Sequence, residues 1–381
     1  MRTQGFERMQ FGGDSNRHRA QLAMACPQLM IGVSLFLFVV VAVLTQRETV
    51  PANQGARGTI KKNLPPTMRH RDEGLGIAWL MSFPNSGTSF TSKLVRHVTA
   101  LSTATNYGEE SEGGLGIFDS NKPPFWLDPH SISSYSRPTK LVLTKTHCGG
   151  RCELCGPKTY IESPHSFLMQ CLSGRGINDL NATKHVSNVM GYEKSLVRKA
   201  VHLIRSPFDN IVSRFHLEIH TSKKEKARNH QRNLGSMLNY TEDSVGFRSF
   251  CAMLDQTYHN EEKHSRWIDD RAMSVMKDVP CRADIVRYVQ WHNLAFVVTR
   301  DLGIPTMELH YEDYQTEFEE IVEQLVKFLE TDVNGEVIDF VIGKSYAKDY
   351  FTPKERLAIR DGVEQLAMQE TWDNIHHYFE E

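Results

Sequence analysis

The sequence lacks a marked excess of either charge. Its 44 lysines and arginines are nearly balanced by 46 aspartates and glutamates, and the formal net charge is -2. Proteins that bind nucleic acid through its phosphates usually carry a basic face or stripe. The balance therefore argues against nucleic acid as a partner, and any site for an anion must be local.

The sequence also lacks the pattern G-x-x-x-x-G-K-[ST], which holds a Mg²⁺-bound triphosphate in many nucleotide-hydrolysing proteins and kinases. It contains no internal repeat. The chain has 381 residues and 40% apolar composition. That is enough for one large α/β domain with appendages, or for two small domains.

Charged residues are absent from residues 20–46, whose core LMIGVSLFLFVVVAVL covers residues 29–44. Roughly 20 apolar residues span a bilayer. One alternative is a cleaved signal peptide, which usually has a shorter apolar region and an A-x-A-like site that is missing here. The other is a buried soluble helix, but the segment has no polar face. We predict a cytosolic tail at residues 1–25, a transmembrane signal-anchor at residues 26–46 and a stem at residues 47–75.

The orientation of this segment follows from the cysteines rather than from charge, because basic residues flank its two ends equally. Six of the seven cysteines lie C-terminal to it, and an even set suits disulfides in an oxidising lumen. The triplets that begin at Asn181 and Asn239 are glycosylation acceptors if they are lumenal. We therefore predict a single-pass type II protein with a lumenal domain at residues 76–381.

Short apolar runs predict buried strands in this domain at residues 77–82, 141–144, 200–204 and 306–309. Apolar residues at helical spacing follow the first and third runs, and also mark residues 283–302 and 318–328. Strands that alternate with helices indicate a mainly parallel sheet. The predicted fold is a three-layer α/β domain with helices on both faces of the sheet.

The first strand is followed by a loop that suits an anion. Residues 82–90 read SFPNSGTSF and join the strand to a helix, a geometry that aims backbone N–H groups and the positive end of a helix dipole at a ligand. Gly87 permits close approach of the backbone, and Thr88 and Ser89 add hydroxyl donors. The alternative is an ordinary helix cap with Ser86 or Thr88 as the N-cap.

A lysine and a histidine lie at the end of the second predicted strand. Lys145 and His147 are two residues apart, so on an extended chain their side chains point the same way. In parallel sheets of this kind the strand ends line the ligand crevice. A cation beside an imidazole can stabilise charge and accept a proton. The alternative is two polar residues at a strand edge.

The third predicted strand delivers Arg205 at its end, Pro207 opens a helix, and Ser213 lies eight residues after the arginine. A guanidinium and a hydroxyl placed in this way can both reach one phosphate. The alternative is a surface ion pair between Arg205 and Asp209.

These three segments together resemble the sulfotransferase family that uses 3′-phosphoadenosine 5′-phosphosulfate (PAPS). The first loop is similar to the family's 5′-phosphosulfate loop, usually written YPKSGT, while Arg205 and Ser213 match its 3′-phosphate motif. Lys-Thr-His at residues 145–147 resembles the strand that carries lysine and base in soluble members, and HYEDY at residues 310–314 resembles the YED segment. The resemblance runs at scattered points from residue 77 to residue 329 and makes the fold P-loop-like.

The resemblance implies transfer of a sulfuryl group from PAPS to a hydroxyl acceptor. The loop residues and the third-strand pair would bind the donor: Asn85, Ser86, Gly87, Thr88, Ser89, Arg205 and Ser213. His147 would deprotonate the acceptor, and Lys145 would replace the loop lysine, because Asn85 stands in its position. Membrane-anchored relatives imply a Golgi location and a glycan or protein tyrosine as acceptor. Lys-Thr-His is more typical of soluble members that act on small hydroxylated molecules, and the sequence does not indicate an oligomeric state.

Two departures from the family pattern keep alternatives open. Asn85 leaves room for a catalytically inactive PAPS-binding membrane module, and a nucleotide-dependent kinase on a related fold is the third hypothesis. The family's C-terminal R-K-G loop is missing, and the nearest basic residues, for which a solvated helix face is the alternative, are Lys344, Lys348, Lys354 and Arg356.

The remaining features are interpreted as structural. We expect Glu312 to have no catalytic role and Asp313 to cap a helix that begins near Tyr314. The cysteines at 148, 152 and 155 have a spacing that could bind zinc, but no matching distal pair is present. Disulfides are therefore expected, among them Cys251 with Cys281.

Overall fold

The structure is a computed structural model, and it describes residues 75–108, 115–117, 139–149, 163–175, 189–228, 240–265, 267–341 and 343–380. The chain divides into two units, Met1–Thr67 and Met68–Glu381, and every described residue belongs to the second. The predicted tail at residues 1–25, signal-anchor at residues 26–46 and nearly all of the stem lie outside the described residues. Within those residues, no helix is long and apolar enough to cross a bilayer.

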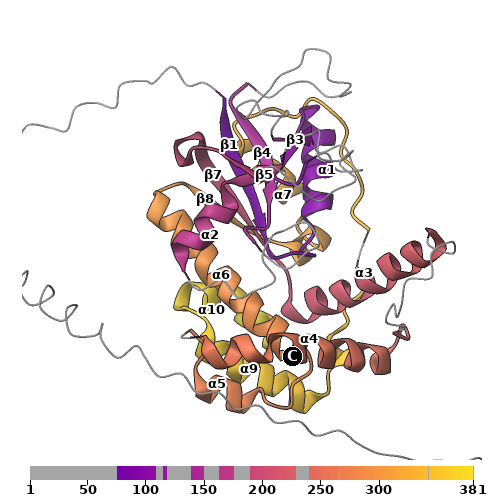
Figure 1. The fold of residues 1–381 in the computed structure, drawn as a ribbon. Coiled ribbons are helices and arrows are strands. Elements are labelled where there is room, and N and C mark those ends of the chain that lie inside the picture. Colours follow the sequence, from indigo (N-terminus) through magenta and orange to yellow (C-terminus); the bar gives the residue numbers. More distant parts are fainter. Residues whose placement is uncertain are drawn as a thin grey trace, which may run out of the picture. The chain divides into compact units, whose positions relative to one another are not determined.

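The domain is built on a six-stranded sheet with the order β3-β2-β4-β1-β7-β8, in which every neighbouring pair is parallel (Figure 1). The four predicted strands are confirmed, and each extends beyond its predicted bounds at one end. The strands are β1 (Gly76–Ser82), β2 (Ala104–Thr105), β3 (Leu115–Gly116), β4 (Leu141–Thr146), β7 (Val197–Ile204) and β8 (Thr306–His310).

Helices cover both faces of this sheet, as the strand sequences predict. Every residue of β1 is buried, and successive side chains enter different cores. Ala78 and Leu80 pack with α1 (Thr88–Thr99) and α7 (Phe318–Phe328). Trp79 belongs to the second core, which contains residues of α2 (Pro164–Cys171), α3 (Pro207–Arg228) and α6 (Arg282–Leu302). The three-layer α/β prediction is therefore confirmed.

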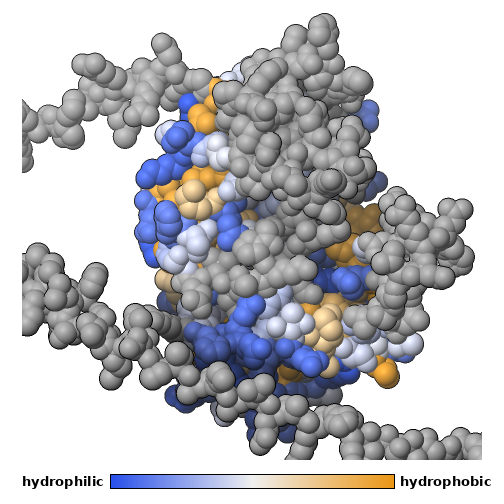
Figure 2. Space-filling view, in the orientation of Figure 1, coloured by the Kyte–Doolittle hydropathy of each residue, from blue (hydrophilic) through white to orange (hydrophobic). Residues whose placement is uncertain are grey.

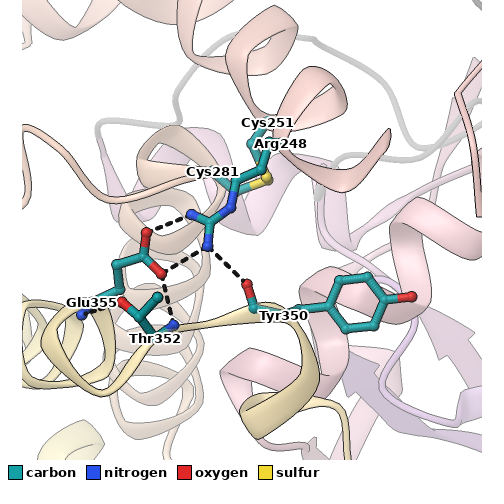
Figure 3. A network of polar contacts seen from close by, with 6 residues as sticks. All are labelled: Arg248, Cys251, Cys281, Tyr350, Thr352 and Glu355. Atoms are coloured by element: carbon teal, nitrogen blue, oxygen red, sulfur yellow. Dashed lines mark hydrogen bonds and ion pairs between the residues drawn. A yellow bond between two sulfur atoms is a disulfide. The ribbon is translucent and has the colours of Figure 1, made fainter. Parts of the chain in front are cut away.

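A helical part follows in the lower half of Figure 1, made of α4 (Ser244–His264), α5 (Asp270–Val275), α9 (Pro353–Leu366) and α10 (Gln369–Ile375). A bidentate ion pair ties α4 to the start of α9 (Figure 3). Arg248 donates to both oxygens of Glu355, at 2.5 and 2.9 Å, and to the Tyr350 carbonyl. Thr352 and Glu355 form a capping box that begins α9. On the face drawn in Figure 2, the surface over α5 and α9 is mainly hydrophilic.

Two disulfides reinforce the domain. Cys251 in α4 is bonded to Cys281 at the start of α6, as expected (Figure 3). Cys148, which follows β4, is bonded to Cys171 at the end of α2. Cys152, Cys155 and both glycosylation triplets' asparagines lie outside the described residues. Among the residues that the structure does describe, no cluster could hold a metal ion.

The structure corrects two expectations about elements. The sequence of residues 149–181 shows no apolar periodicity, which indicates irregular structure, but these residues contain α2 and β5 (Ser173–Arg175), which pairs with β6 (Val189–Gly191). Ser163 caps α2 with its side chain and Pro164 follows at the first position, so the start signal is present in the sequence.

The second correction concerns Asp313. A short 3-10 helix, η3 (Tyr311–Gln315), precedes α7, and the α-helix begins at Phe318. The main-chain carbonyl of Asp313, rather than its carboxylate, accepts hydrogen bonds from Thr316 and Glu317. The predicted side-chain cap is therefore wrong.

Candidate active site

The strands β4, β1 and β7 are neighbours, and the segments that follow them leave the same edge of the sheet. In the register, Met81 lies beside Thr146 and Ser82 beside Leu203. The carboxyl ends of parallel strands therefore bring the loop after β1 together with His147 and Arg205. Two contacts show the convergence: His147 Nδ1 lies 2.9 Å from the Ser82 carbonyl oxygen, and Arg205 Nη1 donates to the Asn85 carbonyl at 2.8 Å.

The loop after β1 ends in a helix start that no side chain caps. Gly87 is the N-cap of α1, with a φ of 100°, and no side chain accepts a hydrogen bond from the first turn. The alternative with Ser86 or Thr88 as N-cap is therefore wrong. The Ser86 hydroxyl instead accepts from Asn210 Nδ2 at 3.0 Å, and the same amide donates to the Pro84 carbonyl. The first N–H groups of a 12-residue helix thus have no side-chain acceptor.

The other loop residues differ in exposure. Asn85 has a left-handed φ of 70° and is half-buried. Thr88 is buried at the start of α1, while Ser89 is exposed. Gly87 lies against Tyr311 of η3, because a Cβ atom at this position would be 2.2 Å from a ring carbon. The glycine is thus required by an aromatic neighbour, a reason that the sequence analysis did not foresee.

His147 is held at three of its four polar atoms. Its N–H donates to the Tyr107 hydroxyl at 2.5 Å, and its carbonyl accepts from Trp291 Nε1 at 2.6 Å. Nδ1 faces the Ser82 carbonyl, which can only accept, so Nδ1 carries the proton and Nε2 carries the lone pair. The Tyr107 ring also stacks on the imidazole, with ring centroids 5.5 Å apart. This arrangement leaves Nε2 as the nitrogen able to take up a proton.

The charge state of His147 follows from its surroundings. Burial lowers the pKa of this imidazole to about 3, and the positive charges of Lys145 and Arg214 add to the effect, against the hydrogen bond to Ser82. The ring is therefore neutral at physiological pH. Lys145 is half-buried on β4, and its charge is one of the causes that lower the pKa of His147.

Arg205 also occupies a defined position. Its guanidinium carbon lies 4.8 Å from the centre of the Tyr311 ring, and its Nε is buried with no hydrogen-bond partner among the described residues. Within the same residues no ion pair joins Arg205 to Asp209, which was the alternative, and the Asp209 carboxylate accepts from the Tyr346 N–H at 2.7 Å. A buried donor without an acceptor normally costs free energy, which makes it a candidate ligand for an anion.

The peptide group after Arg205 is fixed from both sides. Tyr288 of α6 donates its hydroxyl to the Arg205 carbonyl at 2.7 Å, and the Ser206 N–H donates to Glu312 at 3.0 Å. Glu312 also accepts from the Tyr378 hydroxyl at 2.8 Å. Its structural role is thus explained by these two bonds, and burial raises the pKa of its carboxyl group.

Ser213 and the C-terminal basic residues are not joined to this cluster. Ser213 is half-buried on α3, one turn after Asp209, and no contact among the described residues links it to Arg205. Lys344 is exposed and pairs with Asp349 at 2.6 Å. Lys348 and Lys354 are also exposed, as expected for a solvated helix face.

Several residues that complete the site were not predicted from the sequence. Tyr107 and Trp291 hold the main chain of His147, Asn210 holds the loop, and Tyr311 contacts both Gly87 and Arg205. Only Tyr311 lay in a segment that was singled out. The donor set fits phosphate or sulfate groups, because it combines an uncapped helix start with two cationic side chains and a buried, unpartnered guanidinium N–H.

Comparison with known proteins gives the family of the chain. A family model described as a sulfotransferase domain matches residues 77–352, which include every predicted site residue. No curated protein matches. Among solved structures, mouse sulfotransferase SULT7A1 complexed with PAP matches at 14% identity over 80% of this chain and 86% of that one, with a TM-score of 0.32. This likeness is too weak to inform the site.

Proposed function

The chain belongs to the sulfotransferase domain family and is an enzyme that uses PAPS as sulfate donor; from this premise we propose that it sulfates a hydroxyl group of a glycan or a protein tyrosine in the Golgi lumen. The observation that carries the proposed site is the meeting of three strand-end segments, in which Ser82 contacts His147 and Asn85 contacts Arg205.

The donor would be held by groups already in place. When bound, PAPS supplies the sulfuryl group together with several negative charges. The N–H groups of Gly87, Thr88 and Ser89 and the hydroxyls of the last two face the start of α1 and would hold the phosphosulfate. Arg205, with its unpartnered Nε, and Ser213 would hold the 3′-phosphate. Asn85 and Ser86 shape the loop, because the Asn85 carbonyl accepts a hydrogen bond from Arg205 and the Ser86 hydroxyl accepts one from Asn210.

His147 would move the proton. Its Nε2 lone pair accepts the hydrogen of the acceptor hydroxyl, while the proton on Nδ1 stays on its bond to the Ser82 carbonyl. That carbonyl then stabilises the imidazolium. Lys145 would place a positive charge where the family's loop lysine usually acts, because Asn85 cannot carry charge. The positive charge of Lys145 also disfavours the imidazolium form of His147. Charge stabilisation by Lys145 and proton uptake by His147 therefore oppose one another until the negative charge of the donor enters the site.

The cellular setting is supported by the chain outside the catalytic site. The uncharged residues 20–46 would anchor a single-pass type II protein with residues 1–25 in the cytosol. Two disulfides within the described part of the chain suit an oxidising compartment. Membrane anchorage in turn favours glycans and proteins over small molecules as acceptors.

The proposal is tested by incubating the full chain with labelled PAPS and a panel of glycans, tyrosine peptides and small hydroxylated molecules. Transfer to a glycan or to tyrosine is expected, and His147→Ala should abolish it. Lys145→Ala should reduce kcat by tenfold or more, on the order of one lost transition-state charge contact, and change PAPS affinity less.

Other outcomes separate the alternatives. Transfer only to small molecules would overturn the acceptor class. Binding of PAPS without transfer would indicate the inactive module, and phosphorylation from ATP would indicate the kinase. Unchanged turnover of Lys145→Ala would remove this residue from the mechanism.

A further inference from the structure

We propose that Tyr311 is the positioning residue that holds the two anion-binding parts of the donor site, the loop at Gly87 and the guanidinium of Arg205, in one arrangement. The inference rests on the proposed donor site. It concerns a residue that lies in the HYEDY segment at residues 310–314 but has no role in the chemistry proposed above.

The first contact is with the loop. A Cβ atom built at Gly87 would lie 2.2 and 2.4 Å from two adjacent carbons of the Tyr311 ring. The ring therefore occupies the space that any other side chain at residue 87 would need. Because Gly87 is also the N-cap of α1, the ring fixes the backbone at the point where the helix presents its N–H groups.

The second contact is with the arginine. The Arg205 guanidinium lies over the same ring at 4.8 Å, an arrangement that is attractive through the negative face of the ring. Nη1 is bonded to the Asn85 carbonyl, so the plane of the guanidinium is set by two partners. With the ring removed, the group could rotate about the remaining bond, and Nε would no longer point in a fixed direction.

Tyr311 is itself held in place. Its ring packs edge to face on Phe340 at 5.4 Å and on Tyr314 at 6.1 Å. The next residue, Glu312, accepts from the Ser206 N–H and from Tyr378. Tyr311 thus holds the side chain of Arg205, and Glu312 holds the backbone beside Arg205.

The contacts are made by the ring and not by the hydroxyl. Among the described residues, none hydrogen-bonds to the Tyr311 hydroxyl, so its removal leaves the arrangement intact. This separates positioning by the ring from a direct hydrogen bond to the donor and gives the inference its test.

The test compares Tyr311→Phe with Tyr311→Leu in the full chain, with PAP as the probe in calorimetry. Tyr311→Phe should keep the wild-type affinity within about twofold, and Tyr311→Leu should weaken it on the order of tenfold. KM for PAPS should rise to a similar extent while kcat changes less. The matched control is Tyr258→Leu, which removes another ring under an arginine, 4.9 Å from Arg287, outside the site. It should leave PAP affinity unchanged.

Coupling to the arginine is measured in a double-mutant cycle. In an Arg205→Ala background, Tyr311→Leu should cause a smaller loss than in the wild type, because only the contact of the ring with the loop at Gly87 remains to be removed. If Tyr311→Leu does not fold, as judged by its unfolding transition, Tyr311→Met replaces it.

Three results would overturn the inference: equal losses for Phe and Leu, no loss for Leu, or an undiminished loss in the Arg205→Ala background. Failure of the wild type to bind PAP would instead overturn the proposed donor site, so the two failures are distinguishable.

Discussion

His147 shows how the fold chooses which nitrogen of an imidazole reacts. The strand-end position was predicted from the spacing of Lys145 and His147, because carboxyl ends of parallel strands meet at one edge. The tautomer was not, since it depends on the Ser82 carbonyl, 65 residues earlier in the chain. Residue identity thus indicated candidate residues for the site, and tertiary packing decides how the imidazole is oriented.

The sequence predicted a role for Gly87, but it did not reveal the contact with Tyr311 that also requires a glycine there. Gly87→Ala should weaken PAP binding and destabilise the domain, because the new methyl group meets the Tyr311 ring and the φ of 100° disfavours an L side chain. Together the two effects should lower the free energy of unfolding by about 2–4 kcal/mol. The measurements are denaturant unfolding and calorimetry with PAP.

The matched control is Gly303→Ala, at the C-cap of α6. Its φ of 62° is also left-handed, but nothing lies within 4 Å of a new Cβ. It should cost about 1 kcal/mol and leave PAP affinity unchanged. Equal effects of the two substitutions would show that backbone strain alone, without the ring, explains the loss at Gly87.

At the scale of elements, apolar runs predicted the long strands well. β1 and the central parts of β4 and β7 are buried on both faces, and these parts carry the short apolar runs from which the strands were predicted. The two-residue strands β2 and β3 are too short to leave such a pattern. The helix α2 was not predicted, although its capping serine and proline are visible in the sequence. The cysteines around it were interpreted in terms of metal binding and disulfides instead.

The two disulfides allow an element-scale prediction. They close chain segments of similar length, with separations of 23 residues for Cys148–Cys171 and 30 for Cys251–Cys281. Loop-closure entropy then predicts that removing either costs about 3–4 kcal/mol of stability. Only the first adjoins His147. Replacing Cys148 and Cys171 by alanine should therefore also reduce kcat per folded molecule.

The variant with Cys251→Ala and Cys281→Ala is its control, with a similar loss of stability and a kcat near that of the wild type. Unfolding curves and initial rates of sulfate transfer, both below the unfolding transition, measure the two effects. Equal kcat values for the two variants would contradict a positioning role for the Cys148–Cys171 bond.

At the scale of the whole molecule, three buried histidines and one half-buried histidine predict sensitivity to acid. Burial lowers the pKa of His147 and of His202 to about 3 and that of His310 to about 4, and holds the pKa of His292 well below its usual range. In the unfolded chain these groups titrate near 6.5. The unfolded state therefore binds more protons between these values, and stability falls as the pH falls.

Stability should thus be fully present above about pH 6.5 and decline toward pH 4, by about 1.4 kcal/mol per pH unit for each histidine. The Asp255 carboxyl offsets the contribution of one histidine to this slope. Burial raises its pKa to about 6, so the folded state binds its proton in the same pH range. Urea unfolding at several pH values measures the slope. His202→Gln should reduce the slope of stability against pH by the contribution of one histidine. A free energy of unfolding that does not change with pH would contradict the prediction.

The fold class itself was predictable, because alternating strand and helix patterns leave few arrangements of layers. Its connection to the last helices was not. The bonds of Arg248 to Glu355 and of Tyr378 to Glu312 join residues more than 60 positions apart, and neither pair forms a local pattern. Long-range polar contacts of this kind carry no periodicity in the sequence.

The bond between Tyr378 and Glu312 has a consequence for biosynthesis. Tyr378 follows all other residues of the donor site in the order in which the ribosome adds them. While the nascent chain is still being made, Glu312 can meet Ser206 but lacks its tyrosine partner. The polar contacts of Glu312 beside Arg205 are therefore complete only after translation has passed this tyrosine.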